Sequence, residues 1–146
     1  MTILEGFAVE QASLTCFNCI LEKSMKIYTV ERMRTGAGAQ VVAFVNGRPL
    51  QHIVYHSPCG FEFGYAGSGP SDLALSILCD FFGEQPDPEQ IRWGTFKAWE
   101  YYHEFKLAFI TPQKLRMFKI THTQIENWLA SRERQSQRTT SKTDCP

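Results

Sequence analysis

The chain has 146 residues, of which 43% are hydrophobic and 13% aromatic, and this is enough to build the core of one ordinary domain. Its 15 lysines and arginines balance its 15 aspartates and glutamates, so no global field draws it to nucleic acid or to an anionic membrane. The five cysteines form no regular framework, and no run approaches the roughly 18 apolar residues of a bilayer span, so we expect a cytoplasmic protein without membrane contact.

The residue composition divides the chain into three parts. Residues 1–24 form an N-terminal extension that lacks the basic and long apolar regions of a secretory signal. Residues 25–131 carry the periodic patterns of a folded domain. Residues 132–146 are polar and poor in apolar side chains, which predicts a flexible tail.

Strand patterns dominate the first half of the domain. Apolar and polar residues alternate in KIYTVERM (26–33), and VVAFV (41–45) is rich in β-branched side chains, so both predict strands, with TGAGA as the loop between them. The pair Asn46–Gly47 follows, and these residue types tolerate the positive φ angles of a two-residue hairpin turn. We expect the returning strand in RPLQHIVYH (48–56) and a further strand in FEFGYA (61–66).

The sequence GSGP leads from the last of these strands into a helix over residues 70–82. Ser68 or Gly69 is expected to cap this helix, and Gly83 to end it in the left-handed conformation. Its polar stripe consists of Asp72, Ser76 and Asp80. The other faces are apolar and are expected to be buried, which makes this the central helix of the fold.

Two further helices and a short strand complete the prediction. One helix is expected over residues 95–110, before Pro112, and a short strand over residues 117–120. The last helix, residues 122–133, is opened by a capping box of Thr121 and Gln124. These elements predict a single α+β domain, a small antiparallel sheet of about four strands with three helices packed mainly on one face.

The stretch from His56 to Leu78, HSPCGFEFGYAGSGPSDLALSIL, resembles the signature of the family called domain of unknown function 6166. That signature is a His-x-Pro followed by Gly-Phe-Glu-Trp-Gly-Tyr-Gly-Gly-Ser-Gly-Pro-Ala-x-Leu-Ala-Leu. NGRPL, the pair Phe105–Lys106 and ITHTQIENWL extend the resemblance over about residues 25–130. The departures are Cys59, Phe63 and Ala66, where the family favours a small polar residue, tryptophan and glycine.

The resemblance implies no activity, because none is established for the family. It does imply an origin among the short proteins often carried by phages, plasmids and other mobile elements.

The glycine-rich segment GYAGSGPSDLA (64–74) raises the question of whether it cradles a phosphate. It lacks the Gly-Lys-Ser/Thr ending of a Walker loop and the Gly-x-Gly-x-x-Gly of a dinucleotide loop. Pro70 removes an N–H donor, and Asp72 adds a negative charge that repels phosphate. We therefore favour a tight strand-to-helix turn, with a small-ligand site as the alternative. That site would use His56, Glu62, Tyr65, Ser68, Gly69 and Asp72.

Cysteine and histidine spacing defines a second candidate, a zinc site. Cys16 and Cys19 form one half-site and His56 and Cys59 the other, with ligand types that suit structural zinc. The halves are far apart, and TCFNCILEK (15–23) is equally typical of an amphipathic segment that buries its thiols. As a nucleophile and base, His56 and Cys59 lack an identifiable orienting group. We expect no bound metal and no cofactor.

The sequence contains no complete catalytic set, which favours a binding protein over an enzyme. We expect a non-enzymatic intracellular protein that binds a host protein and occludes or sequesters it. The alternative is a small-ligand or nucleotide-binding domain, or a minor hydrolase, that uses residues 60–72. A third interpretation is a nucleic-acid binder that uses the basic tail.

Overall fold

The computed structural model of the chain describes residues 25–140, which belong to two compact units. One unit is Ile27–Ile120, and the described part of the other consists of residues 25–26 and 121–140. The expected extension over residues 1–24, with the half-site of Cys16 and Cys19, lies outside the described residues.

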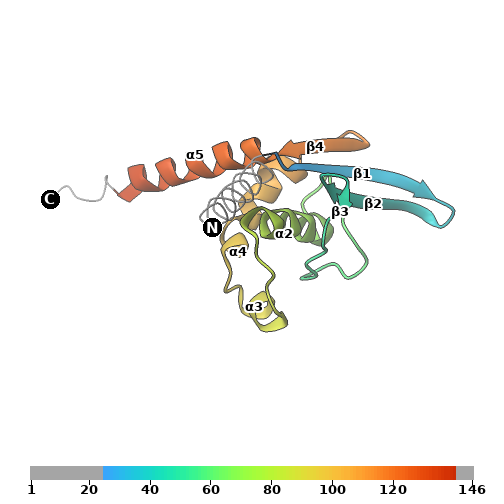
Figure 1. Ribbon diagram of the computed structural model, residues 1–146, viewed down its shortest axis with the longest axis horizontal. Helices are drawn as coiled ribbons and strands as arrows, with labels where there is room; N and C mark the ends of the chain where they lie inside the picture. The colour runs from blue at the N-terminus through green and yellow to red at the C-terminus, as the bar shows by residue number, and fades with distance from the viewer. Residues whose placement is uncertain (1–24, 141–146) are drawn as a thin grey trace, which may run out of the picture. The chain divides into compact units, whose positions relative to one another are not determined.

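The first unit contains a four-stranded sheet in the order β3-β2-β1-β4 (Figure 1). Its strands are β1 (Ile27–Thr35), β2 (Gly38–Val45), β3 (Arg48–Pro49) and β4 (Met117–Thr121). β1 and β2 pair antiparallel from Tyr28↔Val45 to Thr35↔Gly38, so the loop expected between them shrinks to two residues. The predicted hairpin turn is confirmed, since Asn46 and Gly47 have φ angles of 48° and 78°.

The prediction of a long returning strand over residues 48–56 is wrong. Only Arg48 and Pro49 pair with β2, and the chain then leaves the sheet. The reason is competition for backbone donors, because the N–H groups of residues 53 and 55–57 donate to side chains of a helix instead of a strand.

The predicted strand over residues 61–66 is also wrong. Phe61 forms one isolated bridge with Val41, and the rest of the segment is irregular. Phe61 and Phe63 are buried, so the alternation in the sequence records burial rather than a strand. Gly60 and Gly64 flank them with φ angles of 126° and 90°, which interrupt extended pairing.

Helix α2 (Ser68–Phe82) is the central helix, as predicted. Every residue from Gly69 to Cys79 is buried, including the polar Asp72 and Ser76. The helix starts two residues earlier than expected, and Gly67 is the N-cap without a side-chain cap, so the predicted cap at Ser68 or Gly69 is wrong. Gly83 ends the helix at φ 70°, as expected.

Helix α3 (Pro88–Trp93) has no counterpart among the predicted helices. Pro88 stands at the first helical position, where its missing N–H costs nothing. The helix expected over residues 95–110 is present as α4 (Lys97–Phe105), which widens into the π-helical segment η1 (Lys106–Ile110).

In the second unit, α5 (His122–Thr140) begins with the predicted capping box. The backbone N–H of Gln124 donates to Thr121 Oγ1 at 3.2 Å, and that of Thr121 donates to Gln124 Oε1 at 2.8 Å. The predicted end near residue 133 is wrong, because the helix continues to Thr140 through residues that were assigned to the tail.

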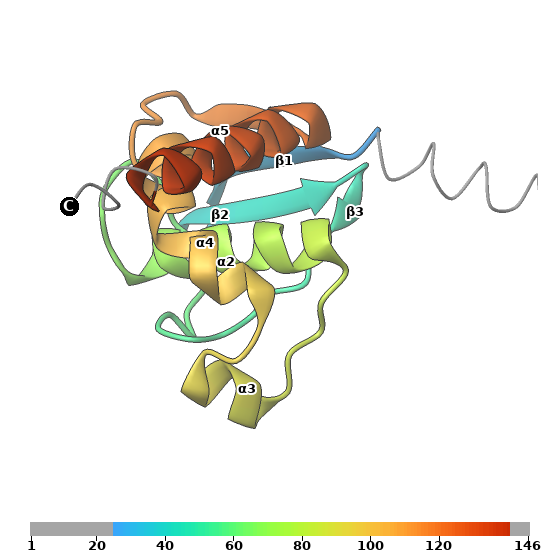
Figure 2. The same ribbon diagram turned by 90° about the vertical axis from the view of Figure 1, so that its left-hand side faces the viewer.

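The predicted α+β class is confirmed, with a four-stranded antiparallel sheet and, among the described residues, four α-helices. In the first unit, α2 and α4 lie together below one face of the sheet (Figures 1 and 2). The strand side chains on that face are buried where the helices cover them, as for Tyr28, Val30 and Ala43. No helix in the described part of the chain has the length and apolar character needed to cross a membrane.

Candidate functional site

Asp72, one of the residues proposed to bind a ligand, holds a loop in place inside the protein. Its carboxylate is fully buried and accepts the backbone N–H groups of Tyr55, His56 and Ser57 at 2.9–3.1 Å. His52 Nε2 lies 3.2 Å from the same carboxylate. One turn further along α2, Ser76 Oγ accepts the N–H of Ile53 at 2.8 Å. The polar stripe of α2 therefore holds the loop after β3, and Asp72 has no face left for a ligand.

Glu62 and Gly69 are brought together by close packing. A Cβ atom added to Gly69 would lie 2.7 Å from Glu62 Cβ, so glycine is required here for contact between the loop and the helix. Gly69 is not among the glycines with a positive φ angle, so the need for glycine here comes from this close contact and not from its backbone conformation. The Glu62 carboxylate forms an ion pair with Arg32 at 2.7 Å.

The other candidate residues do not converge on one point. The ring of His56 contacts the Tyr55 ring in a tilted arrangement with centroids 3.7 Å apart, and the backbone N–H of His56 donates to Asp72. Tyr65 is 50% exposed, and a Cβ atom on Gly67 would collide with its ring. Ser68 lies in the first turn of α2 and forms no cap. The segment over residues 60–72 is thus built as a turn.

A buried lysine lies beneath this turn. Lys106 is the first residue of η1, is 6% exposed, and donates from Nζ to Ser71 Oγ at 3.1 Å. Ser71 Oγ in turn donates to Gly67 O at 2.8 Å, which leaves its proton engaged with the backbone. This arrangement ties η1 to α2 and does not present an activated serine.

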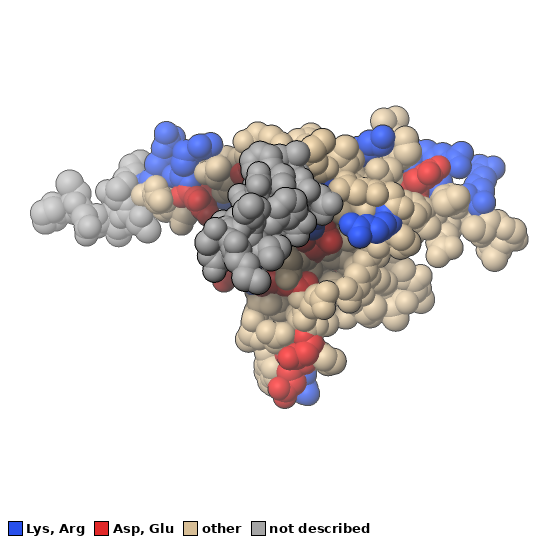
Figure 3. Space-filling model, in the orientation of Figure 1, with Lys and Arg blue, Asp and Glu red and all other residues tan. Residues whose placement is uncertain are grey.

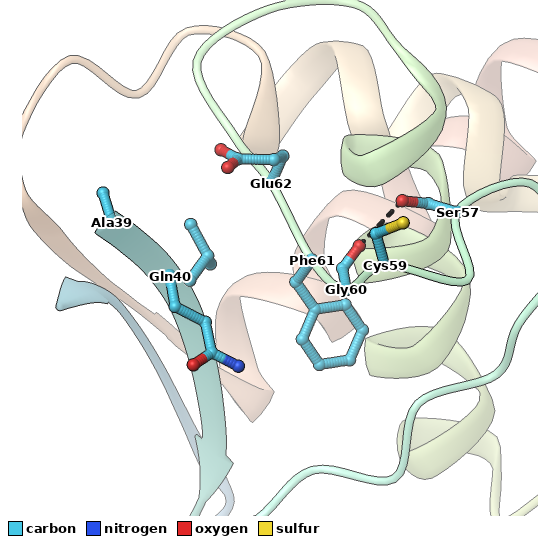
Figure 4. Close-up of a pocket in the computed structure, with 8 residues that line it drawn as sticks. Ala39, Gln40, Ser57, Cys59, Gly60, Phe61 and Glu62 are labelled. Carbon is cyan, nitrogen blue, oxygen red and sulfur yellow. Dashed lines mark hydrogen bonds between the residues drawn. The ribbon is translucent and has the colours of Figure 1, made fainter. Parts of the chain in front are cut away.

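Cys59 lines a small hollow of about 140 Å³ between β2 and the loop (Figure 4). Gln40 comes from β2, and Ser57 donates to Gly60 O at 2.9 Å across the loop. Within residues 25–140, no group of three metal-ligating side chains gathers here or elsewhere. His56 and Cys59 therefore have no third ligand in the described part of the chain.

The inner face of β1 changes character along its length. Tyr28 and Val30 are buried beneath the sheet, and the next two residues on the same face are Arg32 and Arg34. Their neighbours on β2 are Val41 and Ala39. The two arginines therefore lie on the same face of the sheet as the core residues, but in a part of it that is half-buried or exposed.

These arginines form one wall of a larger hollow, which we call the basic hollow. The segment between η1 and β4 forms the other wall, and the cavity volume is about 540 Å³. The complete lining is Arg32, Arg34, Ala39, Lys114, Leu115 and Arg116. In Figure 3, blue side chains gather at the end of the β1–β2 ribbon, where these residues lie.

Three of the four cations are positioned by the protein itself. The Arg32 guanidinium lies 4.5 Å above the centroid of the Phe63 ring while it pairs with Glu62. Arg116 Nε donates to Arg32 O at 3.0 Å, and its terminal nitrogen lies 3.6 Å from Glu31. Lys114 Nζ donates to Gly64 O at 3.3 Å.

Arg34 differs from these three cations. Within residues 25–140 its side chain has neither an ion pair nor a hydrogen bond, and it is exposed. The basic hollow thus combines three oriented cations with one that has no partner among the described residues, beside the apolar Ala39 and Leu115. Such a site can hold a carboxylate or another anion by charge-assisted hydrogen bonds.

The perturbed titratable groups lie elsewhere. Burial raises the pKa of Cys79 to about 12, and the charge of Glu84 adds to this effect. Burial also raises the pKa of Tyr28, whose hydroxyl donates to Asp80 Oδ2 at 2.8 Å. The pKa of Tyr102 is raised by burial, with smaller contributions from Tyr55 and Asp72. None of these groups lines the basic hollow, so they are structural.

None of the six residues that line the basic hollow was predicted from the sequence as a site residue. A signal was present, because two arginines occupy inward positions of a strand that alternates cleanly before them. Lys114 and Arg116 sit in a short basic segment before the last strand, and only the fold brings that segment beside β1.

Comparison with known proteins identifies one family. Residues 28–131 match the sequence model of Family of unknown function (DUF6166), which covers more than half of the chain. No curated protein and no solved structure matches the chain.

Proposed function

Because the chain belongs to the DUF6166 family, whose function is unknown, we propose from its own surface that it is a non-enzymatic protein whose basic hollow binds an acidic segment of a partner protein. The observation that carries this proposal is the convergence of four cations on one cavity in a chain without net charge. Positive charge that is concentrated at one cavity attracts an anionic partner over short distances.

The chemistry of the lining favours binding over catalysis. The guanidinium and ammonium groups supply donors for carboxylate oxygens, and guanidinium groups bind them in bidentate geometry. The residues that line the hollow do not include a nucleophile paired with a general base. A protein with this surface acts by covering or sequestering the segment that it holds.

The surroundings favour a protein partner over nucleic acid. Glu31 and Glu62 pair with two of the four cations and would repel successive phosphates. Leu115 is 71% exposed at the hollow and offers apolar contact area. Arginine beside exposed apolar side chains is typical of protein interfaces.

Selection from a random displayed peptide library tests this proposal, with the full chain as bait. We expect enrichment of peptides rich in aspartate and glutamate. An Arg34→Glu variant should capture few or none of them while it melts at an unchanged temperature, because Arg34 has no partner to lose within residues 25–140.

Arg48→Glu is the matched control, because it makes the same charge change at the other end of the sheet. Arg48 is exposed and pairs with Val45, whereas Arg34 pairs with Ala39, so the two sites are roughly 20 Å apart along β2. Peptides without acidic residues, no enrichment, or equal capture by Arg34→Glu would overturn the proposal. Arg34-dependent binding of a DNA oligonucleotide without peptide capture would replace it with a nucleic-acid function.

A further inference from the structure

Helix α3 presents a tryptophan to solvent. Trp93 is 68% exposed, and the Arg92 guanidinium lies 5.2 Å from its ring centroid. No residue of α3 is fully buried, and Gln90 and Ile91 are half-buried. Tryptophan is the residue type most often found as a binding anchor, because one side chain buries a large apolar area.

The helix is held by local hydrogen bonds instead. Asp87 Oδ1 accepts the N–H of Gln90 at 2.9 Å, and Gln90 Oε1 accepts the N–H of Asp87 at 3.0 Å, which completes a capping box. Gly94 ends the helix at φ 63°. A six-residue helix is not stable alone, so these caps fix the direction in which Trp93 is presented.

Acidic residues flank the tryptophan in the sequence. Glu89 lies in α3 and Asp87 is its N-cap, whereas the Glu84 carboxylate accepts the backbone N–H groups of Lys97 and Ala98 at 2.8 and 2.9 Å. Glu89 has no ion-pair partner among the described residues. Figure 3 shows red atoms in the region of α3. We call residues 84–93 the acidic knob.

We propose that the acidic knob of one copy of this chain docks in the basic hollow of a second copy. This inference rests on the proposed function, since it names a segment that the basic hollow holds. The Glu89 carboxylate of the knob would meet Arg34, which has no ion pair among residues 25–140, and the indole ring would cover Leu115. The cavity of about 540 Å³ lies within the range that proteins use for binding large side chains and ligands.

The contact is between copies because the two surfaces are remote within one copy. The knob lies at the lower edge of the first unit and the end of the β1–β2 ribbon at its far right (Figure 1). Head-to-tail docking leaves one free knob and one free hollow at the ends of every assembly, so growth continues unless a ring closes.

Sedimentation velocity on the full chain provides the test. The unmodified protein should form species that grow beyond a dimer as concentration rises. Trp93→Ser, which removes the aromatic side chain of the knob, and Arg34→Glu, which reverses one charge of the hollow, should each remain monomeric. An equimolar mixture of the two variants should form dimers and nothing larger, because it contains one intact knob and one intact hollow. Arg48→Glu should assemble like the unmodified protein.

A monomeric unmodified protein at the highest soluble concentration would overturn the inference, as would a mixture that stays monomeric. Assembly that depends on Trp93 but not on Arg34 would also overturn it, because the receptor surface would then lie elsewhere. Acidic peptides captured by a chain that never self-associates would leave the proposed function standing, so the two failures are distinguishable.

Discussion

At the scale of single residues, Asp72 shows how one buried carboxylate can organise a loop. Three consecutive backbone N–H groups, those of residues 55–57, converge on it, and replacement of an acceptor leaves buried donors unsatisfied. We expect Asp72→Asn to lower the free energy of unfolding by roughly 1–3 kcal/mol in urea denaturation. Glu89→Gln, at an exposed carboxylate, should change it little, and equal effects at both positions would contradict this role.

Gly69 is a second residue whose role comes from contact rather than from backbone conformation. A methyl group at this position would lie 2.7 Å from Glu62 Cβ, so the loop and α2 would have to separate. We expect Gly69→Ala to cost about 1–3 kcal/mol in the same measurement. Gly36→Ala is the matched control, because nothing lies within 4 Å of its added Cβ. A neutral Gly69→Ala would show that the contact is loose.

The spacing of Asp72, Ser76 and Asp80 correctly predicts one stripe of a helix, but it does not predict that Asp72 and Ser76 are buried. A spacing pattern reports which side chains share a face and not which backbone donors meet them. The loop that supplies those donors has no periodic pattern of its own. The ligand site proposed around Asp72 stays a prediction, and the structure shows that the Asp72 carboxylate accepts backbone N–H groups of the loop.

At the scale of elements, the sequence predicts long periodic segments well. It fails for a segment whose backbone N–H groups bind distant side chains instead of a neighbouring strand. β1, β2, α2 and α5 begin close to the predicted residues because alternation or helical spacing is sustained over many positions. The strand expected after Pro49 does not form, because side chains of α2 accept hydrogen bonds from its backbone N–H groups. The local sequence pattern contains no information about these distant acceptors.

The last turns of α5 provide a prediction at this scale. Every described side chain from Glu133 to Thr139 is exposed, so these residues bury nothing. We expect deletion of residues 133–146 to leave the melting temperature unchanged in a calorimetric scan. A fall of several degrees would show that this part of the helix is stabilised by contacts.

At the scale of the whole molecule, stability should depend on alkaline pH. Burial raises the pKa of Tyr28 above its usual 10.0 and that of Cys79 from 9.0 to about 12, so the folded protein holds both protons more tightly than the unfolded chain. Tighter binding of these protons stabilises the folded state in full below pH 9. The stabilisation is lost as the pH rises above the pKa values of the unfolded chain, because the unfolded chain then ionises while the folded protein does not.

We therefore expect the free energy of unfolding to fall by up to roughly 1.4 kcal/mol per pH unit and group above pH 9–10. Urea denaturation at a series of pH values measures this slope, and Tyr28→Phe should reduce it. An unchanged slope in that variant would contradict the assignment to Tyr28.

The basic hollow also belongs to this scale, because Arg32 and Arg116 are 84 residues apart in the chain. The neutral overall composition hides it, because the 15 acidic residues of the chain equal its 15 lysines and arginines in number. The α+β class could be read from the sequence, whereas this site required the register of β1 and the path of the chain before β4.

The most direct test of the central claim is to locate where an acidic ligand binds, by titrating isotope-labelled protein with hexaglutamate peptide and following backbone amide chemical shifts. We expect the changes to cluster at Arg34, Ala39, Leu115 and Arg116 and to disappear in Arg34→Glu. Changes that cluster instead at residues 64–69, or that persist unchanged in Arg34→Glu, would contradict a binding role for the basic hollow.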